Sequence, residues 1–90
     1  MSVPLISDPE RARRLARVLI SDIATEYAEQ VRIGVEKDDL FERLGPLLKR
    51  ARVFYRARVA SDVKERERMF DFAIVDVLLA QNRAVRRYVW

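Results

Sequence analysis

Apolar side chains recur every three to four residues along most of this chain, which is the pattern of helices that bury one face. The clearest such stripe predicts a long first helix over about residues 8–33. Ser7 or Asp8 can cap its start and Pro9 suits the first helical position, while Gly34 is a plausible left-handed end. The residues of this stripe are Ala12, Leu15, Ala16, Leu19, Ile20, Ile23, Tyr27 and Val31.

A second helix is predicted over residues 40–59, with Asp39 and Glu42 forming a capping box at its start. Proline inside a helix costs about 3 kcal/mol or more, so we expect a break or kink at residues 45–46, where the sequence reads Gly-Pro, and a fresh helix from Pro46. The inward face of the piece after the break consists of Leu47, Leu48, Ala51, Phe54, Tyr55 and Val59. A third helix is predicted over residues 61–88, starting at Ser61 and Asp62.

The most apolar part of the chain is the window 69–80, which is apolar nearly all the way round a helix. Phe70, Ile74 and Val77 share one face, whereas Phe72 and several other apolar residues lie on the remaining faces. The start of the window also alternates in the manner of a β-strand. Good helix formers flank it on both sides, and neither Gly nor Pro follows Pro46, so a helix is favoured.

These elements predict one all-α domain over residues 1–90, with residues 1–6 as a loose leader. At about 1.5 Å per residue, the first and third helices would each be roughly 40 Å long and the piece after Pro46 about 20 Å. So short a middle helix cannot cover both long ones. We therefore expect the three-helix domain to complete its bundle as a homodimer, through the third-helix residues Phe70, Phe72, Ile74, Val77 and Leu78.

Charge is distributed in blocks along the chain. The net charge is +4, but residues 18–42 carry −5 and residues 43–61 carry +6. Such blocks can pair with each other within or between subunits. Alternatively, Lys49, Arg52 and Arg56 line one side of the second helix and could bind the phosphates of a nucleic acid.

The composition argues against an enzyme. The chain has neither His nor Cys, which removes the commonest general base and the usual zinc ligands, so no catalytic, cofactor or metal site is predicted. The carboxylates of Asp22 and Asp76 are expected to pair with arginines of a neighbouring helix or to face solvent. Neither a secretory signal nor an apolar run of about 20 residues is visible, so a cytoplasmic protein without membrane contact is expected.

The run from Ala12 to Tyr27, ARRLARVLISDIATEY, resembles a segment of uncharacterised helical bacterial proteins, together with Val31, Gly34 and the later Tyr55. In those proteins the segment tends to follow regulatory or zinc-ribbon modules. The resemblance implies a helical interaction module and no enzymatic activity.

Taken together, these features predict a non-catalytic scaffold, adaptor or regulatory subunit that associates with itself or with another protein. The alternative is a small basic regulator associated with nucleic acid.

Overall fold

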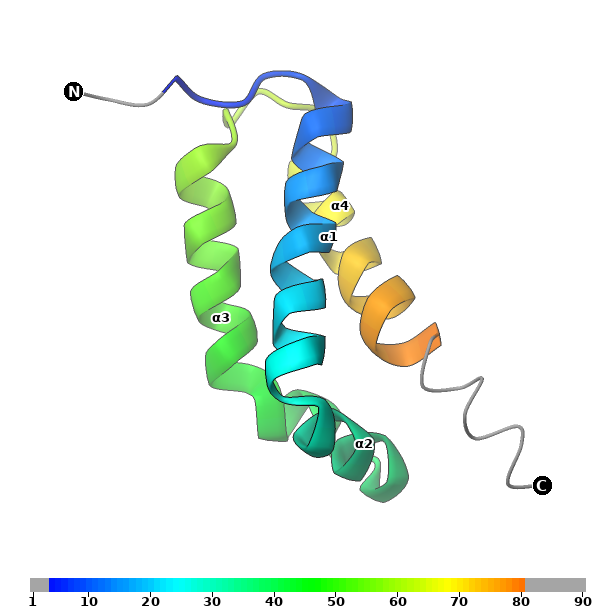
Figure 1. The fold of residues 1–90 in the computed structure, drawn as a ribbon. Coiled ribbons are helices and arrows are strands. Elements are labelled where there is room, and N and C mark those ends of the chain that lie inside the picture. Colours follow the sequence, from blue (N-terminus) through cyan, green and yellow to red (C-terminus); the bar gives the residue numbers. More distant parts are fainter. Residues whose placement is uncertain (1–3, 81–90) are drawn as a thin grey trace.

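A computed structural model of the protein describes residues 4–80, and over this range the chain is all-α, as predicted. Four α-helices are followed by a π-helix (Figure 1): α1 (Pro9–Glu26), α2 (Ala28–Lys37), α3 (Leu40–Arg58), α4 (Arg66–Ala73) and η1 (Ile74–Ala80). The window 69–80 is helical throughout, so the strand alternative is wrong. The predicted count of three helices is also wrong for the described residues. The rest of the predicted third helix, residues 81–88, lies outside them.

The core lies where α1 packs between α3 and the α4–η1 segment (Figure 1). Small α1 residues, Ala12 and Ala16, are fully buried and let the other helices approach closely. Large side chains from the neighbouring helices fill the space around them. Those with the largest fully buried volumes outside α1 are Tyr55, Phe70, Leu44, Leu78 and Val59.

The predicted first helix is in fact two helices, because the backbone leaves helical geometry at Tyr27 (φ −118°, ψ 35°). The change of direction packs α2 against the start of α3. A side-chain carbon on Gly34 would lie 2.8 Å from the Cα of Leu40, so this glycine permits a close helix contact. It does not end the helix as predicted; the left-handed residue at the end of α2 is Asp38 (φ 58°).

The predicted break at residues 45–46, with a fresh helix from Pro46, is wrong, because α3 continues through Pro46 as one helix of 19 residues. The alternative of a kink without a break stays a prediction. Pro46 has no N–H to donate to the carbonyl of Glu42. Gly45 has no Cβ, which removes one of the clashes that a proline imposes on the residue before it. At about 28 Å, α3 is as long as α1, so the short middle helix on which the length argument for a dimer rested does not exist.

Helix caps were predicted with mixed success. Asp8 caps α1 by accepting a hydrogen bond from the backbone N–H of Glu10 (3.1 Å), and Pro9 follows it as expected. The carboxylate of Asp39 makes no capping bond and instead accepts from the guanidinium of Arg43 (2.9 Å). The helix predicted to begin at Ser61 begins instead at Arg66, as α4, five residues later.

The N-terminal segment is not loose at Ile6. The Ile6 N–H donates to the carbonyl of Arg58 (2.8 Å), and the Ile6 carbonyl accepts from the N–H of Ala60 (2.9 Å). This short parallel bridge fastens the segment before α1 to the end of α3. It thereby forms one wall of the groove described below.

Candidate interaction surface

The residues predicted to form a dimer interface lie mainly inside the chain's own core. Phe70, Ile74, Val77 and Leu78 are each no more than 7% exposed, because α1 covers this side of α4 and η1. Their assignment to a partner interface is corrected accordingly. Only Phe72, at 59% exposure, projects outward from the predicted set.

Phe72 lies beside a shallow groove of about 370 Å³ between α1 and α4. Asp76, on the rim of the same groove, accepts a hydrogen bond from the guanidinium of Arg17 (3.1 Å). This pair is the predicted contact between Asp76 and an arginine of a neighbouring helix. The charges beside Phe72 are therefore partly satisfied within the chain.

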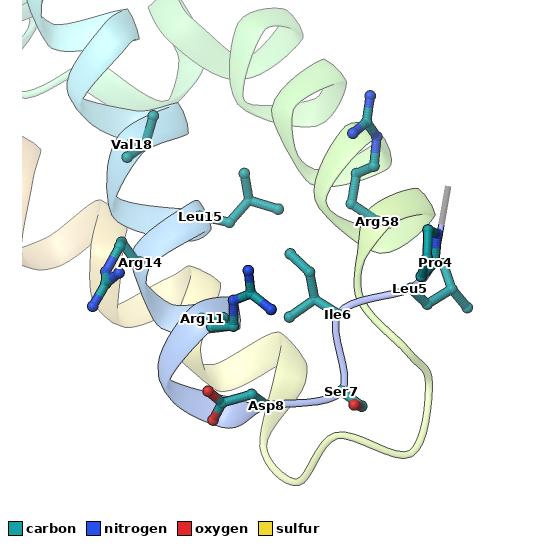
Figure 2. Close-up of a pocket in the computed structure, with 10 residues that line it drawn as sticks. All are labelled: Pro4, Leu5, Ile6, Ser7, Asp8, Arg11, Arg14, Leu15, Val18 and Arg58. Atoms are coloured by element: carbon teal, nitrogen blue, oxygen red, sulfur yellow. The ribbon is translucent and has the colours of Figure 1, made fainter. Parts of the chain in front are cut away.

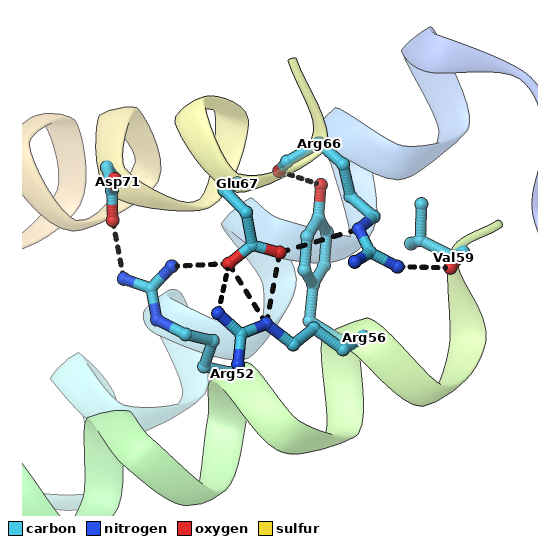
Figure 3. A network of polar contacts seen from close by, with 7 residues as sticks. Arg52, Arg56, Val59, Arg66, Glu67 and Asp71 are labelled. Carbon is cyan, nitrogen blue, oxygen red and sulfur yellow. Dashed lines mark hydrogen bonds and ion pairs between the residues drawn. The ribbon is translucent and has the colours of Figure 1, made fainter. Parts of the chain in front are cut away.

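Two of the three residues predicted to bind nucleic acid are ion-paired with α4 (Figure 3). Glu67 accepts hydrogen bonds from Arg52 (3.1 Å) and Arg56 (2.6 Å), and Arg52 also bonds the carboxylate of Asp71. Lys49 is exposed and has no ion pair within residues 4–80. Within the basic block, Arg52 and Arg56 thus pair with acids of α4, whereas Arg43 pairs with Asp39 of the acidic block 18–42.

The same cluster joins α3 to α4 by apolar and neutral contacts. The Tyr55 hydroxyl donates to the carbonyl of Arg66 (2.8 Å), while its ring lies 5.2 Å from that of Phe70. The Arg52 guanidinium lies over the Phe70 ring, 4.6 Å from its centroid. Hydrogen bonds from Arg56, and to a smaller extent from Arg52, lower the pKa of the Glu67 carboxyl. Burial raises the pKa of the Tyr55 hydroxyl. This cluster stabilises the packing of α4 against α3.

A different set of arginines surrounds a groove of about 620 Å³ formed by the N-terminal segment, α1 and the end of α3 (Figure 2). Arg11, Arg14 and Arg58 line it and have no ion pair within the described chain. The Arg58 guanidinium stacks over Phe54 instead, 4.7 Å from the ring centroid. The apolar lining includes Ile6 and Leu15, with Leu5 and Val18 more exposed at 55% and 49%.

The outer face of α1 continues from this groove as a single exposed stripe. Arg11, Arg14, Val18, Asp22 and Glu26 succeed one another at steps of three or four residues, which places them on one side of the helix. All five are exposed. The stripe is basic before Val18 and acidic after it, and none of its four charges has an ion pair within residues 4–80.

Of this stripe, the sequence predictions include only Asp22, which was expected to pair with an arginine of a neighbouring helix or to face solvent. The sequence does contain a signal for this stripe, because the charged residues on this face are basic before Val18 and acidic after it. The pattern becomes informative only when the structure shows that other charged residues, such as Arg17 and Arg52, have partners. Val18, Arg14 and Asp22 are therefore added to the candidate set.

Neither a cluster of three or more potential metal ligands nor a helix able to cross a bilayer occurs among residues 4–80. Comparison with protein-family models, curated proteins and solved structures finds no match for this chain. The resemblance of the α1 sequence to bacterial helical segments therefore stays a prediction.

Proposed function

We propose that this protein is a non-catalytic helical association module that acts as a scaffold, adaptor or regulatory subunit by joining to a second copy of itself. The observation that supports this most directly is the outer face of α1. There, exposed apolar and charged side chains of both signs lie together without partners in the described chain. Charges of both signs that have no partner in the described chain can orient a partner surface that carries the complementary pattern.

The remaining chemistry of the chain is consistent with a binding role. The sequence has no His and no Cys, and its best-connected polar cluster, around Glu67, joins α3 to α4. The nucleic-acid alternative loses the support of Arg52 and Arg56, whose guanidinium groups already contact carboxylates. Of the three residues predicted to bind nucleic acid, only Lys49 has no carboxylate partner in the described chain, and one charge offers little electrostatic attraction for a phosphate backbone.

The proposal is tested by measuring the mass of the protein in solution. Sedimentation velocity and light scattering, run from low micromolar to high micromolar concentration, should show a rise from the 10.6 kDa chain toward twice that mass. The rise should be weaker at high salt, because charges contribute to the contact. A single-chain mass at every concentration would refute self-association.

A further inference from the structure

We infer that two copies associate through α1, packed antiparallel about a twofold axis at Val18, so that Arg14 of each copy faces Asp22 of the other. This inference rests on the self-association proposed above and adds the surface, the orientation and the register. It is centred on the stripe on the outer face of α1, which residues 4–80 leave uncovered.

The register follows from the positions of the charges relative to Val18. Arg14 lies four residues before Val18 and Asp22 four residues after it, so an antiparallel twofold axis at Val18 brings these two together. Arg11 then falls one turn farther out, beside Thr25 and Glu26 of the other copy. Steps of four and seven residues return to the same side of a helix, so all these positions can meet simultaneously.

Electrostatics selects this orientation over its alternatives. A parallel arrangement of the two α1 helices would place Arg11 and Arg14 against themselves, and Asp22 against itself. The antiparallel arrangement forms two symmetry-related Arg14–Asp22 contacts in a single interface. Charge pairs at a partly exposed contact contribute modestly to affinity, and their main effect is to exclude wrong registers.

Apolar contacts complete the interface near the axis and in the adjoining groove. Val18 would meet its own symmetry mate, and Leu5, at 55% exposure, lines the groove beside it. Phe54, at 42% exposure, lies under the guanidinium of Arg58, another residue that lines this groove. A stable complex normally buries about 800 Å² on each partner, more than one helical stripe supplies. We therefore expect a weak, salt-sensitive dimer.

The other exposed apolar surfaces lack this self-complementarity. On α3, Val53 is accompanied by Lys49 and Arg50, so two copies of that face would repel each other. Around Phe72, the pair between Arg17 and Asp76 is already formed within the chain. Arg68 and Asp76 also lie at equal distances on the two sides of Phe72, but each already has an ion pair, with Glu65 and Arg17 respectively. Within residues 4–80, only the α1 stripe combines this arrangement with charges that have no ion pair.

The decisive experiment exchanges the charges. Arg14→Glu and Asp22→Arg each place like charges at both symmetry-related contacts, so each variant alone should dimerise about tenfold or more weakly than the wild-type chain. An equimolar mixture of the two variants should form a heterodimer, because both contacts are then between opposite charges. The double variant should recover the homodimer.

Arg13→Glu is the matched control, because Arg13 is exposed, belongs to the same helix and produces the same change in net charge as the Arg14 variant. It should leave its own dimerisation within about twofold of wild type. In a mixture with Asp22→Arg it should form few heterodimers, because one of the two symmetry-related contacts is then between two arginines. Thermal melting monitored by circular dichroism verifies that each variant is folded, which the exposure of these residues predicts.

The outcomes separate the two proposals. A wild-type protein that is monomeric at all concentrations overturns both self-association and the α1 pairing. A wild-type dimer that is indifferent to these charge changes, or variants that fail to recover on mixing, overturns the α1 pairing and leaves self-association standing. Recovery confined to the Arg14 and Asp22 combination supports the pairing.

Discussion

The two sides of the molecule use charged residues in opposite ways. Between α3 and α4, Arg52 and Arg56 contact Glu67 and Asp71, and one arginine lies on a buried aromatic ring. On the outer face of α1, Arg11, Arg14, Asp22 and Glu26 have no such contacts within the described chain. The composition of the two surfaces is similar, so what distinguishes them is whether a neighbouring helix supplies the opposite charge.

The largest expected effect compares two phenylalanines two positions apart. Phe70 is fully buried against Tyr55, so Phe70→Ala should lower the free energy of unfolding by about 3–5 kcal/mol. Phe72 is 59% exposed, and Phe72→Ala should change the free energy of unfolding by less than about 0.5 kcal/mol. Urea denaturation of dilute protein measures both. Similar losses for the two variants would contradict the burial described here.

The next effect compares one carboxylate from each side. Glu67→Gln removes the charge shared by Arg52 and Arg56, and should cost about 1–2 kcal/mol, because the contacts are charged but partly exposed. Asp22→Asn should stay within about 0.5 kcal/mol of wild type in dilute solution, since that carboxylate has no ion pair in the described chain. Equal destabilisation in urea would remove the distinction between the two sides.

A smaller effect is expected at the tyrosine hydroxyls. Tyr55→Phe leaves the carbonyl of Arg66 without its donor and should cost about 1 kcal/mol. Tyr27 is 38% exposed and its hydroxyl makes no hydrogen bond within residues 4–80, so Tyr27→Phe is the matched control and should be nearly neutral. Thermal unfolding followed by circular dichroism distinguishes them, and a larger loss for the control would argue against the Tyr55 contact.

The smallest effect is a pH dependence. Arg56 and Arg52 hold the pKa of Glu67 below its usual value of 4.5, so the ionised form stabilises the fold above that pH, and the contribution is lost as the pH falls through the lower, folded-state pKa. The difference in melting temperature between wild type and Glu67→Gln should therefore be constant near neutrality and shrink in acid. A difference that persists unchanged at low pH would show that the charge of Glu67 is not its source.

Much of the helical content was predictable because it depends on local spacing. The apolar stripe of α1 and the cap at Asp8 were both visible in the chain. The errors lie where tertiary packing overrides a local preference: Tyr27 interrupts a continuous stripe, and α3 accommodates Pro46. Gly34 was read as a helix end, although its role is to let Leu40 approach.

The candidate surface shows the same division. The order of charges about Val18 is a property of the sequence, and it specifies which orientation of two α1 helices is electrostatically favourable. The sequence likewise determined that the chain is helical and has no histidine or cysteine chemistry. Only the tertiary structure decided which charged side chains have a partner within the chain, because an ion pair such as Arg52–Asp71 joins residues on different helices. Local periodicity places a residue on a face of its helix, whereas its partner depends on how the helices pack.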